Sequence, residues 1–285
     1  MKLLRFGEPG SEKPGALDAD GRIRDLSSHI EDIGPDQLDD ASLAKLAAID
    51  LKSLPAVPAS IRRGPPVSGI RKIVCIGLNY SDHAAESGLP IPAEPVVFMK
   101  ADTSIAGPND DVVMPLISKK LDWEVELGII MGKEAHYIEE SDALDYIAGY
   151  CVVNDVSERE FQIEGTGQWT KGKSHDTFCP LGPELTTRDE IPDPQSLDLW
   201  LDIDGQRLQT GSTSLMIFSV AHIVSYLSRY MTLRPGDLIS TGTPPGVGLG
   251  FKPPRYLKAG EVMSLGIQGL GEISQTVVHH PRHRG

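Results

Sequence analysis

Cysteine is scarce in this chain, with only three residues among 285, at Cys75, Cys151 and Cys179. An odd number of widely separated cysteines argues against a disulfide framework and against a zinc site built from closely spaced thiols. Each of the three lies in an apolar or proline-flanked stretch. We therefore expect buried free thiols and a reducing compartment.

Long apolar segments and an excess of positive charge are also missing. No run reaches the length of about 20 apolar residues that crosses a bilayer, and the opening MKLLRFGEPG has no long apolar stretch before a small-residue cleavage site. Acidic residues outnumber basic ones by 40 to 27, giving a formal net charge of -13, and no basic stripe is present to hold a phosphate backbone. We expect a cytoplasmic protein with neither a membrane nor a nucleic acid as its partner.

The chain does contain enough apolar sequence for one substantial core and a smaller appendage, since 40% of its residues are hydrophobic and 24% are charged. The first segment is typical of short strands, with a hairpin turn at Asp20-Gly21, followed by a helical pattern over 36–54 and a proline-rich linker. We expect a small β-rich N-terminal domain with its linker in 1–66 and the main domain in 67–285.

Short apolar segments rich in β-branched residues dominate the main domain, whereas helical patterning is largely confined to 214–231. No period of about 20 to 50 residues repeats, which argues against a propeller or a solenoid. We therefore predict an α+β fold that is predominantly β. The expected strands are RKIVCIG, VVFMKA, LDWEVELGIIMG, YIAGYCVVND, LDLWLDIDG and GDLISTGTP.

The segment DWEVEL carries alternating acids. A strand's period of two places Asp122, Glu124 and Glu126 on one face. Because like charges at this spacing repel, the row must face water, bind protons or hold a cation, and oxygen ligands suit magnesium, calcium or manganese. Taken alone, such a row is more often a solvated antiparallel strand.

A further acid follows the apolar run YCVV. Asp155 stands where this strand should end, and Ser157 to Glu160 matches the S-x-x-E capping box of a helix start. Asp155 is therefore expected at a strand-to-helix corner, where site residues gather. A helix-flanking acid that stabilises the helix N-terminus explains it equally well.

A histidine and a glutamate lie three residues apart in NYSDHAAESG. If Ser81 caps a helix that stops at Gly88, His83 and Glu86 share one helix face. A carboxylate beside an imidazole raises its basicity, as a general base acting on water requires. A surface pair without a catalytic role is the alternative.

Two glycine-containing loops complete the candidate set. Lys173 lies in WTKGKS. A lone loop lysine is usually just solvated, and only a metal-bound anion nearby would give Lys173 a role in stabilising negative charge. The segment STGTPPGVG lacks the lysine of a phosphate-binding loop, so we interpret it as a tight turn.

Taken together and in this order, these segments resemble the fumarylacetoacetate hydrolase superfamily, in its branch of acylpyruvases and 2,4-diketo-3-deoxy sugar acid hydrolases. The shared motifs are N-Y-x-D-H-x-x-E, E-x-E, N-D-V-S-x-R, G-K-S-x-D-T-F-C-P and S-T-G-T-P-x-G-V-G, spread from Ile73 to Val278. The resemblance implies a mixed β-roll catalytic domain, a smaller N-terminal domain and a homodimer.

The resemblance also implies roles for individual residues. Magnesium or manganese would be held by Glu124, Glu126 and Asp155, and His83 with Glu86 would activate water. Further positions that match the family's site are Lys173, which would steady an enolate, and Lys100, Arg159 and Thr243, which would contact the substrate. Asp122 is not a usual ligand, so we expect it behind the ligands or facing solvent.

The implied reaction is metal-dependent hydrolysis of a C–C bond in a 2,4-dioxo acid through a metal-bound enolate, with release of pyruvate or a related 2-oxo acid. Similarity favours a sugar-derived substrate over a simple acylpyruvate. The alternatives are an oxaloacetate-type decarboxylase, a lyase related to proteins labelled ureidoglycolate lyase, and a catalytically silent oligomeric scaffold. The intact water-activating pair argues against the scaffold.

Overall fold

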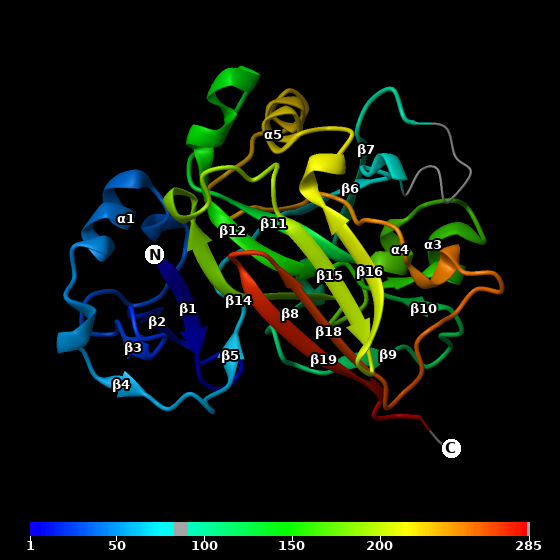
Figure 1. The fold of residues 1–285 in the computed structure, drawn as a ribbon, viewed down its shortest axis with the longest axis horizontal. Helices are drawn as coiled ribbons and strands as arrows, with labels where there is room; N and C mark the ends of the chain where they lie inside the picture. The colour runs from blue at the N-terminus through cyan, green and yellow to red at the C-terminus, as the bar shows by residue number, and fades with distance from the viewer. Residues whose placement is uncertain (83–90, 284–285) are drawn as a thin grey trace.

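The computed structural model of the protein describes residues 1–82 and 91–283. Strands make up most of its regular structure, and they form one large mixed sheet, one smaller sheet and a short two-stranded ladder (Figure 1). The predicted α+β fold with a predominance of strands is confirmed.

Twelve strands of the described chain form the large sheet. They are β1 (Lys2–Phe6), β2 (Lys13–Leu17), β3 (Ile23–Asp25), β4 (Ala56–Val57), β5 (Arg63–Gly64), β6 (Ile73–Gly77), β7 (Val96–Lys100), β8 (Ile105–Ala106), β11 (Val125–Met131), β12 (Ile147–Asn154), β14 (Cys179–Thr187) and β17 (Leu238–Ser240). Their order is β4-β3-β2-β1-β14-β12-β11-β17-β6-β7, while β5 pairs with β1 and β8 pairs with β14.

The smaller sheet packs against the large one across the main core. The smaller sheet has the order β16-β15-β18-β19-β9, and β10 pairs with β13 in the two-stranded ladder. Their bounds are β9 (Val112–Met114), β10 (Leu121–Asp122), β13 (Ser157–Glu158), β15 (Asp198–Ile203), β16 (Gln206–Ser212), β18 (Val262–Ile267) and β19 (Gly271–His279). The helices of the described residues are α1 (Asp40–Ala47), α3 (Arg159–Ile163), α4 (Thr170–Lys173) and α5 (Val220–Ser228).

The main core lies between the two sheets. Along β11, Val125 and Leu127 join this core together with side chains of β15 and β18, whereas Ile130 joins a second core on the opposite face. This alternation is the period of two expected for a strand. It places Glu124 and Glu126 together on the face that carries Ile130, away from the main core.

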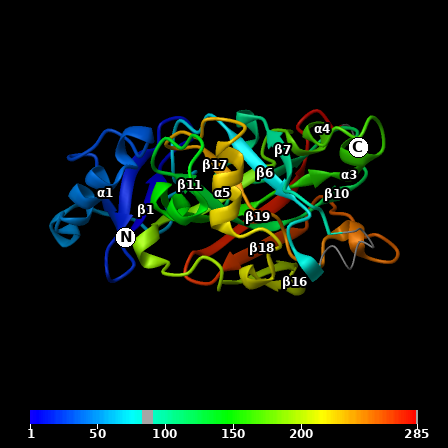
Figure 2. The same cartoon turned by 90° about the horizontal axis from the view of Figure 1, so that it is seen from above.

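The N-terminal strands extend the large sheet, because β1 pairs with β14 with Leu3 opposite Leu185. This segment lies at one end of the molecule in both views, and α3 and α4 lie toward the other end (Figures 1 and 2). The predicted turn at Asp20-Gly21 joins β2 to β3, and the Gly21 N–H donates to Asp18 O at 2.9 Å. The division of the chain into two domains stays a prediction.

The helix predicted over 36–54 is shorter than expected. Only Asp40–Ala47 is α-helical, with 3-10 turns at Pro35–Gln37 and Leu51–Ser53. Asp39 caps α1 by accepting hydrogen bonds from the N–H groups of Ala41 and Ser42. Because a cap residue adopts extended backbone, it separates α1 from the turn before it.

The capping box predicted at Ser157 is wrong. Ser157 lies in β13, where its hydroxyl donates to Asp155 O at 2.9 Å. Helix α3 instead begins after Glu158, whose side chain accepts from the Glu160 N–H. The helix begins one residue later than predicted because Ser157 and Glu158 form β13, which pairs with β10.

All three cysteines are buried free thiols, as predicted. No helix among the described residues is long and apolar enough to span a membrane.

Candidate active site

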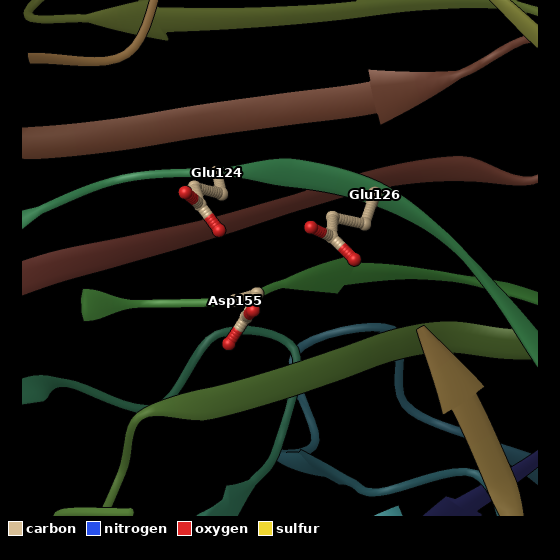
Figure 3. Close-up of side chains that lie close together, drawn as sticks. All are labelled: Glu124, Glu126 and Asp155. Carbon is tan, nitrogen blue, oxygen red and sulfur yellow. The ribbon is translucent and has the colours of Figure 1, made fainter. Parts of the chain in front are cut away.

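Strand register brings three acids together. Strands β11 and β12 are antiparallel, with Val125 opposite Asn154. One step further along, the Asp155 N–H donates to Glu124 O at 2.9 Å, so these two residues lie opposite each other. Glu126 is the next residue on the same face of β11. Ligand atoms of Glu124, Glu126 and Asp155 all lie within 4.8 Å of one another, and all three residues are buried (Figure 3).

Two of these acids are neutralised by buried cations. Lys173 Nζ lies 2.6 Å from Glu124 Oε2 and 2.7 Å from Asp155 Oδ2. Lys100 Nζ lies 2.5 Å from Asp155 Oδ1, and an Arg159 nitrogen lies 2.6 Å from Glu124 Oε1. Burial opposes ionisation of Glu124, but the charges of Lys173 and Arg159 outweigh it and lower its pKa to about 2.

Glu126 has no such neutralisation. Its Oε2 accepts hydrogen bonds from the Ser240 hydroxyl at 2.6 Å and from the Gly242 N–H at 2.9 Å. Among the described residues, no lysine or arginine forms a salt bridge with Glu126. Burial and the charges of Asp155 and Glu124 therefore raise its pKa well above the usual value.

The three carboxylates fit a hard divalent cation. They provide only oxygen donors, which magnesium and manganese prefer, and no sulfur or imidazole of residues 1–82 and 91–283 belongs to the cluster. In the part of the chain that the structure describes, no lysine or arginine pairs with the buried Glu126 carboxylate, and a cation held with Glu124 and Asp155 would supply the missing positive charge.

Glu124 and Glu126 line the inner end of a cavity of about 580 Å³, and Asp155 lies beside them without lining it. Glu126 and Lys173 are only 2% and 1% exposed, whereas Ile163 and Leu249, which also line the cavity, are 43% and 37% exposed. The cavity therefore leads from the charged cluster to the surface. The expected site residues that line it are Glu124, Glu126, Arg159, Lys173 and Thr243.

Two expected site residues of the described chain, Lys100 and Asp155, do not line the cavity. Lys100 is fully buried and is not among the residues lining the cavity; its Nζ donates to Asp155 and to Val156 O. Lys100 therefore holds the Asp155 carboxylate in place. His83 and Glu86 lie outside the described residues, and their role stays a prediction.

Asp122 is a buried acceptor that joins two parts of the site. Its Oδ1 accepts from the Trp123 N–H at 2.8 Å and the Gly248 N–H at 2.6 Å. Its Oδ2 accepts from Arg159 Nε at 2.7 Å and the Leu249 N–H at 3.0 Å. Asp122 thus links Arg159 to the loop that forms one wall of the cavity. Arg159 in turn contacts Glu124. Asp122 was expected either behind the acids of the cluster or facing solvent. It is fully buried behind Glu124, so the first expectation is correct.

A glycine makes this close approach of the loop feasible. A Cβ atom at Gly248 would lie 2.0 Å from Arg255 O and 2.7 Å from Asp122 Oδ1, so a larger residue would push the loop away from the acid. The GVG at the end of the predicted turn is the sequence signal for this contact.

Sequence reasoning overlooked the aromatic wall of the cavity. Phe98 and Trp169 meet edge to face, with ring centroids 5.2 Å apart, and both line the cavity. Phe98 appears in a predicted strand and Trp169 in a predicted loop, and no pattern along the chain connects the two. Only the fold brings β7 and α4 together.

Comparison with known proteins places this geometry in a family. The model of the fumarylacetoacetate (FAA) hydrolase C-terminal domain matches residues 72–278. A protein of Burkholderia multivorans whose name describes a hydrolase is 62% identical over 276 residues, which cover 96% of this chain and 98% of that protein.

Solved structures give the same result. The fumarylacetoacetate hydrolase of Exiguobacterium antarcticum superposes with a TM-score of 0.85 at 36% identity, covering 98% of this chain and 100% of that one. The maleylpyruvate hydrolase of Sphingobium sp. SYK-6, solved with manganese(II) and pyruvate, superposes with a TM-score of 0.81 at 29% identity, covering 98% and 99% of the two chains.

Proposed function

Because this chain belongs to the fumarylacetoacetate hydrolase family, we propose that it hydrolyses the C3–C4 bond of a 2,4-dioxo acid and releases pyruvate or a close relative. The observation that carries the proposal is the buried cluster of Glu124, Glu126 and Asp155 beside the ammonium of Lys173, at the inner end of an otherwise mostly apolar cavity. A neighbouring structure contains manganese(II) and pyruvate, which supports both the cofactor and the product class.

Magnesium or manganese is the cofactor that we propose for the three acids. When bound, such an ion polarises carbonyl oxygens and stabilises developing negative charge. Ion pairs with buried lysines fix the carboxylates of Glu124 and Asp155. Hydrogen bonds from Ser240 and Gly242 orient the Glu126 carboxylate. These contacts fix the acids before any ligand binds.

The residues of this chain provide the rest of the chemistry. Water adds to the C4 carbonyl, the C3–C4 bond breaks, and its electron pair stays on C3 as the enolate of pyruvate. The proton taken from water returns to C3, and the C4 fragment leaves as a carboxylic acid. Lys173 places a buried positive charge where the enolate forms, and Arg159 faces the same cavity to hold an anionic group. His83 with Glu86 is the proposed base for water.

The test is pyruvate release from acetylpyruvate, a sugar-derived 2,4-dioxo acid and oxaloacetate. We expect release from a dioxo acid with magnesium or manganese, loss of activity with a chelator, and recovery when metal is added back. Turnover that ignores the chelator would contradict the metal assignment. Release from oxaloacetate alone would instead favour decarboxylation, which produces the same enolate and needs no activated water.

Asp122 provides a second test, because it acts on substrate only through Arg159 and the loop at Leu249. Asparagine at this position has one acceptor oxygen, so half of the hydrogen bonds of Asp122 are lost. Since a hydrogen bond to a charged group contributes about 1.5 to 3 kcal/mol, KM should rise about 10- to 100-fold in Asp122→Asn while kcat changes less.

A double-mutant cycle separates positioning from general destabilisation. Arg159→Lys should raise KM similarly, and combining it with Asp122→Asn should add little, because both changes act on the same guanidinium. Additive effects, or a lower melting temperature with unchanged KM, would show that Asp122 is only structural. Asp111→Asn, an exposed acid elsewhere, is the control.

A further inference from the structure

We propose that the substrate tail beyond C4 is apolar, an alkyl or aryl group rather than a polyhydroxylated or charged chain. This inference rests on the proposed function, since it assumes that the carboxylate and 2-oxo group lie at the acids. It departs from the sugar-derived substrate that sequence similarity favours.

The direction of the tail follows from burial. The charged groups that bind the dioxo acid head lie at the closed end, where Glu126 and Lys173 are almost fully buried. A substrate with its head at this end must extend its tail toward the exposed side chains of Ile163 and Leu249. The residues along this path therefore determine which tails fit.

One wall of the path is aromatic from the charged end outward. Lys173 Nζ lies 5.1 Å from the centroid of the Phe98 ring, and Phe98 meets Trp169 edge to face. The indole lies directly over Gly77, where a Cβ atom would be 2.3 Å from Trp169 Cζ3. Glycine at the end of β6 thus allows the indole to line the cavity.

Leu78, the next residue, continues this wall at a conformational cost. Its φ of 54° lies in the left-handed region, which glycine and asparagine adopt more easily than leucine. A leucine that adopts this conformation while lining the cavity points to a use for that apolar side chain.

A second group of lining residues comes from the loop that Asp122 anchors. Its apolar contributions to the cavity are Val247, Leu249, Phe251 and Pro254. Leu249 and Ile163 both rank among the exposed large hydrophobic side chains of the described residues. Apolar groups exposed inside one cavity are favourable for binding because an apolar ligand removes them from water.

Uncharged hydrogen-bonding side chains are few along this path. Gln162 Oε1 already accepts from Arg159, and the Thr243 hydroxyl donates to Val125 O. A polyhydroxylated tail would lose hydrogen bonds to water and gain few in return from the described lining. Among the described lining residues, Lys252, exposed at the mouth, is the one that would suit a charged tail end.

The experiment compares kcat/KM for pyruvate release with manganese across acetyl-, butanoyl-, hexanoyl- and benzoylpyruvate, a trihydroxyalkyl analogue and an analogue ending in a carboxylate. Each buried methylene contributes about 0.8 kcal/mol, so kcat/KM should rise about fourfold per methylene until the cavity is filled. The trihydroxyalkyl and carboxylate analogues should fall below butanoylpyruvate.

A pair of variants ties the preference to the cavity. Leu249→Ser should reduce the ratio of kcat/KM for hexanoyl- over acetylpyruvate about tenfold, because the serine buries much less apolar area against the tail. Ile117→Ser is the matched control, since Ile117 is 70% exposed and does not line the cavity. It should leave the ratio unchanged.

Each other outcome overturns the inference in a recognisable way. Turnover of acetylpyruvate with no gain for longer tails, or with the trihydroxyalkyl analogue preferred, would refute the apolar tail and leave the proposed function intact. Preference for the carboxylate analogue would indicate Lys252 as the tail contact. Pyruvate release from none of the panel would refute the proposed function itself.

Discussion

Replacing Glu126 with glutamine should reduce metal-dependent turnover about 1,000-fold or more while leaving the metal-free protein at least as stable as the parent. A metal ion contributes several kcal/mol of transition-state stabilisation, and about 1.4 kcal/mol corresponds to a factor of ten. Glutamine retains an oxygen that accepts from Ser240 and Gly242 but carries no charge to repel Glu124 and Asp155.

Melting temperatures measured in chelator and in manganese separate the loss of metal binding from a loss of stability. Thermal unfolding in chelator should give Glu126→Gln a melting temperature equal to or above that of the parent, and the rise in melting temperature on adding manganese should shrink. Glu139→Gln, an exposed acid whose side chain caps nothing, should match the parent in both. A variant that unfolds at a much lower temperature in chelator would show that Glu126 is a structural acid.

The second large effect is expected at Lys173, with the opposite pattern. Lys173→Met should reduce turnover about 100- to 1,000-fold, since it removes a buried donor from the developing enolate. It should also destabilise the metal-free protein by about 3 kcal/mol or more, because Glu124 and Asp155 each lose one of two buried cations.

The affinity for manganese distinguishes a lysine that acts on the enolate from one that holds the metal-binding acids in place. Without the ammonium, the negative charge of the three acids is less neutralised and no Lys173 charge repels the ion. Manganese should therefore bind as tightly as in the parent or more tightly, as measured by calorimetry. Lys171→Met, on the exposed side of α4, should change neither binding nor turnover. Weaker manganese binding together with normal turnover would contradict the assigned role.

Local patterns predicted the strands of this fold well where alternation and β-branching coincide, as along β6, β11 and β12. Strand β14 was beyond such reasoning, because Pro180 and Pro183 are typical of loops. Strand β14 forms because it pairs with β1 on one side and with β12 on the other, and only the tertiary structure brings these strands beside it. The capping box at Ser157 failed for a similar reason, since pairing with β10 overrides the local signal.

In the site, too, local sequence patterns predict some features, while others depend on tertiary structure. The period of two in β11 is enough to place Glu124 and Glu126 on one face, but it does not indicate burial or a partner. Asp155 joins them only through the register of β11 and β12, and Lys100 reaches it from β7. The importance of Asp122 depends on the loop at Gly248, which is distant along the chain.

The register of β11 and β12 also determines where the chain can change in length. The acids lie at one end of this strand pair, and the connection over 132–146 lies at the other, about 20 Å away for seven residues of strand. Parts of this connection pack into the main core, but Glu139 and Ser141 are exposed. An insertion at these exposed positions leaves the ladder, and so the position of Glu124 opposite Asp155, unaltered. One residue added within either strand would turn the acids to the wrong face. The exposed positions of the connection are therefore where the chain can change in length without moving the acids.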